Sequence, residues 1–186
     1  MLEKELKVML TKEQYEKIDK LISWEDVYDQ INFYYAKEGN EDIPGTPTVR
    51  IRSKKGKMQL EVKVPVSANA GAIMQHEEYA KDIAYIPPVI LRETLNELLE
   101  RTDMQDTKLL GFLYTNRRIS TKYEGCEIAL DKNEYLGKTD YELEVEFTDE
   151  LPCELLREFE FLNIDQSRKV TGKYRRFIHE RENCRA

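Results

Sequence analysis

The stretch Tyr141-Glu142-Leu143-Glu144-Val145-Glu146-Phe147 alternates acidic and apolar residues without a break. Successive side chains of a β-strand point to opposite faces, so the three glutamates share one face and the apolar residues share the other. In an antiparallel sheet, a strand of this kind packs its apolar face on the core. The stretch therefore predicts a strand with one charged and one apolar face.

Four other segments divide in the same way between a polar and an apolar face. Their polar faces carry Glu3, Glu5 and Lys7; Arg50, Arg52 and Lys54; Gln59, Glu61 and Lys63; and Glu127 and Asp131. Period-2 segments as a whole predict strands at about 2–9, 28–36, 47–54, 57–64, 108–121, 124–131, 140–147 and 173–179. This pattern indicates a chain dominated by strands.

Turn and helix signals fill the remaining sequence. Glycine in Lys54-Lys55-Gly56-Lys57 and in Tyr123-Glu124-Gly125-Cys126 predicts two hairpins, which make the flanking strands antiparallel. Helices are expected after Thr11-x-x-Gln14, which resembles a capping box, after Pro87-Pro88, and at about 151–162. Residues 67–85 give only a weak helical spacing.

Composition bounds the classes of function. The 186 residues are 35% charged and 40% hydrophobic, with a net charge of −7, which suits one domain over 1–186 and disfavours nucleic acid as a partner. The charged start of the chain and the lack of a long apolar run predict neither a signal peptide nor a membrane anchor. Three widely spaced cysteines predict a cytoplasmic protein with reduced thiols.

Two readings of the charged strand faces are open. Amphipathic strands commonly turn their polar face to water. Here, however, acids gather in some strands and arginines in others. This segregation favours an α+β fold in which eight strands close into an antiparallel β-barrel, a tunnel with a charged interior and flanking helices.

The residue types define the chemistry of such an interior. The planar guanidinium of arginine binds phosphate oxygens bidentately, so Arg50, Arg52 and Arg117 would hold a polyanion. Clustered carboxylates bind Mg²⁺ or Mn²⁺ through oxygen, often beside substrate phosphates. Acids and arginines together therefore indicate a site for a metal and a phosphate group.

The order of these charged motifs along the chain resembles a known family. Glu3-Lys4-Glu5-Leu6-Lys7 resembles the ExExK signature of the CYTH domain, the triphosphate tunnel metalloenzymes that include class IV adenylyl cyclase and thiamine triphosphatase. Later family elements follow in order, at Arg50-Ile51-Arg52, Glu61-Val62-Lys63, Glu142–Glu146 and Lys173–Arg176. The segment Gln30-x-Asn32-x-Tyr34-Tyr35 is similar to a bacterial group within the family.

The resemblance implies a set of site residues. The implied ligands of Mg²⁺ or Mn²⁺ are Glu3, Glu5, Asp131, Glu142, Glu144 and Glu146. The implied triphosphate-binding residues are Lys7, Arg50, Arg52, Lys63, Arg117, Lys173 and Arg176. Of these two sets, Glu3, Glu5, Lys7, Arg52, Lys63 and Arg117 are the implied catalytic residues.

The expected activity is metal-dependent hydrolysis of a triphosphate, inorganic tripolyphosphate first. The alternatives are an adenylate cyclase of class IV type, a thiamine or nucleoside triphosphatase, and a polyphosphate-binding protein without catalysis. Ala36 and Glu61 depart from the common family pattern and bear on substrate choice. Oligomeric state is left open, with a homodimer as one alternative.

Other motifs are set aside. Gly137-Lys138-Thr139 resembles the end of a phosphate-binding loop but lacks its first glycine. His76 and His179 are isolated, which disfavours a histidine metal site.

Overall fold

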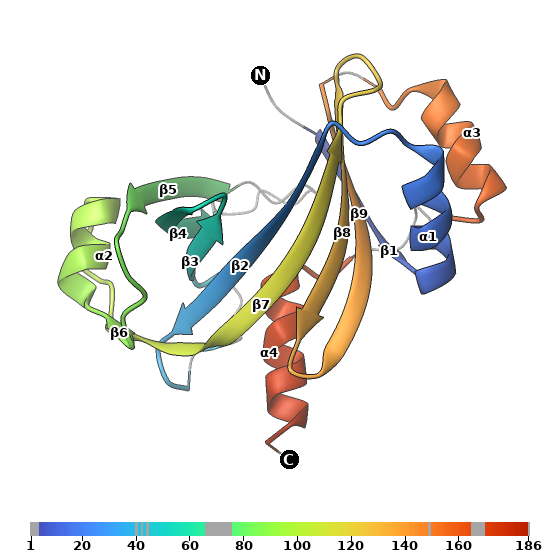
Figure 1. Ribbon diagram of the computed structural model, residues 1–186. Coiled ribbons are helices and arrows are strands. Elements are labelled where there is room, and N and C mark those ends of the chain that lie inside the picture. The colour runs from blue at the N-terminus through green and yellow to red at the C-terminus, as the bar shows by residue number, and fades with distance from the viewer. Residues whose placement is uncertain are drawn as a thin grey trace. The chain divides into compact units, whose positions relative to one another are not determined.

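Nine strands and four helices make up the described part of the chain, which in this computed structural model covers residues 4–39, 41, 43, 45–65, 76–148, 150–164 and 170–185 (Figure 1). The strands are β1 (Lys4–Leu10), β2 (Asp26–Ala36), β3 (Thr48–Lys54), β4 (Lys57–Pro65), β5 (His76–Asp82), β6 (Val89–Ile90), β7 (Thr107–Ser120), β8 (Cys126–Tyr135) and β9 (Lys138–Phe147). The helices are α1 (Lys12–Leu21), α2 (Arg92–Leu99), α3 (Cys153–Phe161) and α4 (Lys173–Asn183).

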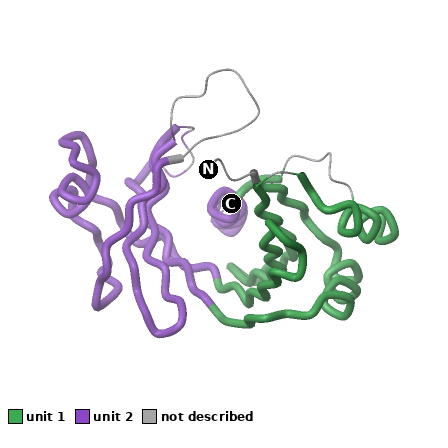
Figure 2. Tube along the Cα trace, turned by 90° about the horizontal axis from the view of Figure 1, so that it is seen from above, with its two compact units in different colours: residues 1–29, 114–172 green, residues 30–113, 173–186 purple. Residues whose placement is uncertain are grey.

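The strands form one sheet in the order β1-β9-β8-β7-β2-β3-β4-β5, with β6 paired to β7. The predicted α+β class, an antiparallel sheet with flanking helices, is confirmed. The chain divides into two compact units, unit 1 with residues 1–29 and 114–172 and unit 2 with residues 30–113 and 173–186 (Figure 2). Strands β2 and β7 contribute to both units; a single domain over 1–186 stays a prediction.

Seven of the eight predicted strands are confirmed, and the strand expected at 173–179 is wrong, because these residues begin α4. Tyr174, Phe177 and Ile178 are spaced i, i+3 and i+4, which places them on one helix face, and the last two are buried. Strands β5 and β6 were not predicted.

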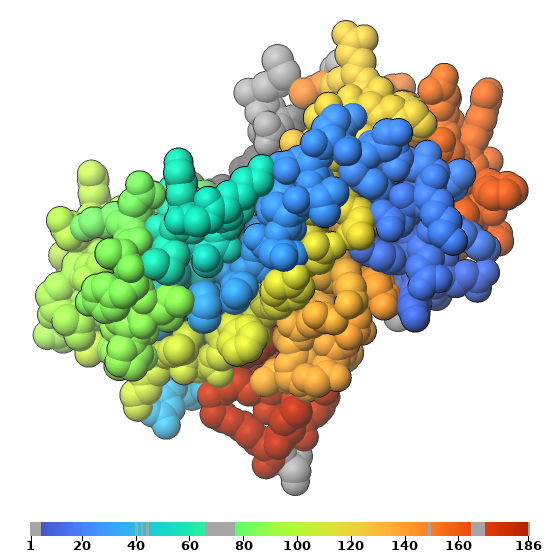
Figure 3. All heavy atoms as spheres, in the orientation of Figure 1, coloured from blue at the N-terminus to red at the C-terminus, as the bar shows by residue number. Residues whose placement is uncertain are grey.

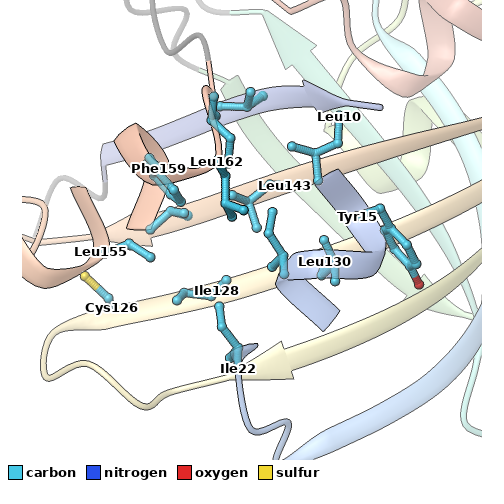
Figure 4. Packing of buried hydrophobic residues seen from close by; sticks show 14 of the residues in the cluster. Leu10, Tyr15, Ile22, Cys126, Ile128, Leu130, Leu143, Leu155, Phe159 and Leu162 are labelled. Atoms are coloured by element: carbon cyan, nitrogen blue, oxygen red, sulfur yellow. The ribbon is translucent and has the colours of Figure 1, made fainter. Parts of the chain in front are cut away.

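The apolar sheet face of unit 1 packs against α1 and α3 (Figure 4). Leu143 of β9 and Ile128 and Leu130 of β8 are fully buried there, as the alternation predicts. Helix α1 begins with the predicted capping box. The backbone N–H of Gln14 donates to Thr11 Oγ1 over 3.1 Å, and the backbone N–H of Thr11 donates to Gln14 Oε1 over 2.9 Å. The two helices thus leave the charged sheet face of unit 1 on the opposite side.

Unit 2 has an equivalent apolar layer and a second, aromatic contact. Helix α2 packs on the apolar face of β3 and β4 through Leu95 and Leu99. Tyr34 points to the other face of β2, where its ring lies 5.2 Å from Tyr174 and 5.3 Å from Phe177 between centroids. Helix α4 is therefore fixed to the polar side of the β2 strand.

Gly111 of β7 lies where an added side chain would collide with Phe177. Its φ is +147°, and a Cβ there would lie 2.9 Å from Cζ of the buried Phe177. We expect Gly111→Ala to destabilise the protein by about 1–3 kcal/mol in urea unfolding, because the added methyl group displaces Phe177 and with it α4. Gly39→Ala is the control, since Gly39 also has a positive φ, of +81°, but nothing within 4 Å of its Cβ position. Equal losses in the two variants would contradict a packing origin.

Candidate functional site

The charged sheet face of unit 1 is assembled by strand register. Glu142 of β9 lies opposite Asp131 of β8, and Asp131 lies opposite Arg117 of β7. In the next row Lys7 of β1 lies opposite Glu144. Because directly opposed residues of antiparallel strands share a face, four strands bring these side chains onto one surface.

Three of these carboxylates form a buried cluster. Carboxylate oxygens of Asp131, Glu142 and Glu144 all lie within 4.8 Å of one another. Asp131 and Glu142 are 0% exposed and Glu144 is 7% exposed. Buried carboxylates at this spacing repel one another unless cations compensate them.

Arg117 supplies one compensating charge. Its Nε donates to Asp131 Oδ1 over 2.8 Å, and its Nη2 donates to Asp131 Oδ2 over 2.6 Å and to Glu144 Oε2 over 2.5 Å. Burial lowers the pKa of the Arg117 guanidinium, but Asp131 and Glu144 outweigh burial and leave this pKa well above its ordinary value. Arg117 thus pairs with two of the three carboxylates, and the ammonium of Lys7 lies 3.6 Å from Glu144.

The donor set of this cluster fits a hard divalent cation. Mg²⁺ and Mn²⁺ prefer oxygen ligands, and each of the three side chains offers a carboxylate oxygen. Asp131, Glu142 and Glu144 are the described residues that would hold such a cation.

The other predicted metal ligands lie beside this cluster or beyond the described residues. Glu5 lies opposite Glu146 across β1 and β9, and both are exposed. Lys7 Nζ lies 2.8 Å from Glu5 Oε1. Glu3 is outside the described part of the chain.

Unit 2 has a charged face of its own, built by the same rule. Arg50 of β3 lies opposite Glu61 of β4, Arg52 lies opposite Gln59, and Lys63 lies opposite Glu78 of β5. Here the cations come from β3 and β4, and the acids alternate with them across the strands.

Glu61 organises the two arginines. Its Oε2 accepts hydrogen bonds from Arg50 Nε and Nη2, both over 2.7 Å, and its Oε1 lies 3.6 Å from Arg52 Nη1. Arg52 Nε donates to Asn32 Oδ1 over 3.0 Å. The side chains of Arg50 and Glu61 are 12% and 14% exposed. Glu61 is thus the acid that orients the paired arginines.

Lys63 has its own acidic partner. Its Nζ lies 2.5 Å from Glu78 Oε1. Burial raises the pKa of the Glu78 carboxyl, but hydrogen bonding to Lys63 and the charges of Lys63, Arg50 and Arg52 outweigh burial and lower this pKa overall. Glu78 therefore stays ionised among these cations.

The two α4 residues of the predicted site belong to the same electrostatic environment. Burial raises the pKa of the Tyr34 hydroxyl, against the opposing effect of Arg50, Lys173, Arg52 and Arg176. All four cations act on one buried hydroxyl, so unit 2 gathers them around Tyr34. Lys173 and Arg176 are i, i+3 neighbours in α4, so both lie on one helix face.

The burial of these groups decides between the two readings of the strand faces. Asp131, Glu142, Glu144, Arg50 and Glu61 are largely withdrawn from water. A solvated polar face does not bury ionised side chains, because loss of hydration costs several kcal/mol per ion unless partners restore it. These parts of the charged faces are therefore not simple solvated surfaces.

Sequence reasoning missed three members of the unit 2 face. Asn32 and Tyr34 were noted in a similar segment without a site role, and Glu78 was not predicted to be a site residue. Pairing with Arg52 and Lys63 required the strand register, which alternation alone does not give.

Comparison with known proteins agrees with this arrangement. The sequence model of the CYTH domain matches residues 1–174. This chain belongs to the CYTH family. It is 32% identical over 154 residues to the Bacillus subtilis (strain 168) protein named "Putative triphosphatase YjbK", which covers 80% of this chain and 78% of that protein.

Solved structures share the CYTH fold of this chain. A protein from Bacillus halodurans, described as a "putative adenylate cyclase", has a TM-score of 0.69 and 24% identity, covering 95% of this chain and 99% of that one. HpAC1 from Hippeastrum, whose structure is described as revealing a dominant triphosphatase activity, has a TM-score of 0.70 and 20% identity, covering 96% of both chains. Among the described residues of this CYTH chain, no helix is long and apolar enough to cross a membrane.

Proposed function

We propose that this protein is a cytoplasmic, divalent-metal-dependent phosphohydrolase that acts on a triphosphate, inorganic tripolyphosphate first. The observation that carries the proposal is the buried cluster of Asp131, Glu142 and Glu144 held by Arg117. Membership of the CYTH family and the similarity to YjbK support a triphosphatase in particular.

Unit 1 carries the candidate metal ligands. Asp131, Glu142 and Glu144 would hold the cation, with Glu3, Glu5 and Glu146 as further candidates, while Arg117 keeps two of the carboxylates in place. When bound, Mg²⁺ or Mn²⁺ neutralises phosphate charge and lowers the pKa of an associated water. Lys7 supplies a proton-bearing cation next to Glu144.

Unit 2 carries most of the candidate phosphate-binding cations. Arg50 and Arg52 present planar donors that match phosphate oxygens, and Lys63, Lys173 and Arg176 add positive charge. Phosphoryl transfer depends mainly on positioning and charge neutralisation, so these residues need no nucleophile among them. Their task is to orient the triphosphate and stabilise the charge that develops on the leaving phosphate.

The surroundings of the unit 2 cations favour an inorganic chain over a nucleotide. Tyr34, the hydroxyl of which is affected by these cations, is 1% exposed and its ring contacts those of Tyr174 and Phe177. A ring covered on this scale cannot stack on a base, and stacking is the usual means of holding one.

The test is a substrate panel with purified protein. Tripolyphosphate, thiamine triphosphate and ATP are each incubated with Mg²⁺ or Mn²⁺, and released phosphate and cyclic AMP are measured. We expect phosphate from tripolyphosphate, and its loss in Arg52→Ala. Cyclic AMP from ATP would select the cyclase instead, and tight calorimetric binding without phosphate release would select a binding protein.

Glu61 offers a prediction specific to this chain. Its carboxylate competes with substrate phosphate for Arg50, whereas a glutamine there still accepts a hydrogen bond from Arg50 Nε. We expect Glu61→Gln to lower KM for tripolyphosphate roughly 5-fold, equivalent to about 1 kcal/mol, with kcat little changed. Steady-state kinetics measures both constants. Gln59→Glu, one position along the same face, is the converse control and should raise KM; a raised KM in Glu61→Gln would show that the carboxylate aids binding.

A further inference from the structure

A groove of about 300 Å³ continues the arginine-bearing face of unit 2 toward the hairpin between β3 and β4. It is lined by Arg52, Lys54, Lys55, Lys57, Gln59 and Glu61. The hairpin, in teal, lies at the molecular surface in Figure 3. The groove thus begins at Arg52 of the proposed phosphate site and ends at three lysines to which no role has been assigned.

The register shows why the lysines gather in the groove. Arg50, Arg52 and Lys54 alternate along β3, so they share one face at intervals of about 6.7 Å, two strand residues apart. Lys54 and Lys57 are direct cross-strand partners, and the two turn residues between them, Lys55 and Gly56, have φ values of +50° and +75°. The tight turn holds three ammonium groups around one end of the groove.

This concentration of like charge suits an anionic ligand. Like charges directly opposite one another destabilise an antiparallel pair, and a lysine at positive φ is conformationally unfavourable. An anion lying along the groove would relieve the repulsion. Its charge would have to extend beyond the part bound at Arg52.

We propose that the groove binds the distal part of a linear polyphosphate longer than three phosphates, so that Lys54, Lys55 and Lys57 determine chain-length preference. The proposal rests on the proposed function, because Arg52 is shared with the triphosphate site. The groove lining favours polyphosphate over a nucleic acid, since none of its residues is aromatic and no base could stack there. Flexible ammonium groups suit a chain of evenly spaced charges.

The test compares Lys54→Gln/Lys57→Gln with the wild-type protein by calorimetry in a chelator, so that binding is measured without turnover. We expect affinity for long-chain sodium polyphosphate to fall at least about 10-fold, and the slope of log affinity against log salt to fall by about 2. Affinity for tripolyphosphate should change less than about 2-fold. The charge-matched control is Lys12→Gln/Lys20→Gln, which removes two exposed lysines of α1 and should change neither affinity.

Three outcomes would overturn the inference. These are an unchanged affinity for long polyphosphate, an equal loss for tripolyphosphate and long polyphosphate, and equally tight, lysine-dependent binding of a single-stranded oligonucleotide. The binding assay does not require hydrolysis. A selective loss of polyphosphate affinity in a protein that hydrolyses no triphosphate would therefore uphold the groove while refuting the proposed function.

Discussion

Replacing Arg117 with methionine should lower the melting temperature by about 10 °C in the presence of a chelator. The substitution leaves the buried carboxylates of Asp131 and Glu144 without the guanidinium that now contacts both. Removing one partner of a buried ion pair costs about 3–5 kcal/mol, and each kcal/mol is worth about 2–4 °C in a chain of this size. Adding Mn²⁺ should restore part of the loss, because a divalent cation compensates the same carboxylates. Thermal unfolding with and without Mn²⁺ measures both effects.

Arg118→Met is the matched control for this experiment. Arg118 also pairs with an acid, Asp19, over 2.7 Å, but the two side chains are 22% and 32% exposed. Its loss should be smaller and indifferent to Mn²⁺. Equal responses of the two variants to Mn²⁺ would remove the link between Arg117 and a metal site.

Glu142→Gln should reduce both Mn²⁺ affinity and triphosphatase activity by at least about 100-fold. Glu142 is fully buried within the carboxylate cluster, and the amide keeps the shape of the side chain but removes the charge that binds a cation. Even residues that only support metal ligands change affinity or activity by about 10- to 100-fold when replaced. Calorimetric titration with Mn²⁺ and phosphate release are the two measurements.

Glu134→Gln makes the same chemical change on β8, where Glu134 pairs with Lys132 over 2.7 Å and its side chain is 44% exposed. It should leave both quantities near the wild-type values. If Glu142→Gln binds Mn²⁺ as tightly as Glu134→Gln does, the cluster is not the metal site.

Alternation along the chain predicted most of the fold because a strand repeats every two residues. Glu142 and Glu144 were assigned to the charged face, and Leu143 to the core, on this basis alone. Strand β5 was missed because Tyr79 is the one large apolar residue in His76–Asp82, so the segment lacks an alternating apolar face. Helix α4 was misread as a strand because Tyr174 and Ile178, four residues apart, fit a repeat of two residues as well as a helical repeat.

The sequence predicted which residues form the candidate site more completely than which of them contact one another. Residue type suggested that Arg50 and Lys63 bind phosphate, but not that Glu61 and Glu78 pair with them. Those partnerships depend on which residues lie opposite each other across β3, β4 and β5. Register is set by turn geometry and packing over the whole strand, and no local pattern contains it.

The ion pairs of Arg50, Arg52 and Lys63 also bear on discrimination among anions. On the proposed function, a phosphate ligand would compete with Glu61 and Glu78 for these three cations. Orthophosphate offers one phosphate group and would replace these acids only in part, whereas a chain of phosphates can meet several cations in the same binding event. Ligand selectivity often depends on groups of the protein that oppose the binding of the wrong ligand as much as on groups that attract the right one. Glu61 and Glu78 would thereby disfavour the binding of orthophosphate relative to the binding of longer phosphate chains.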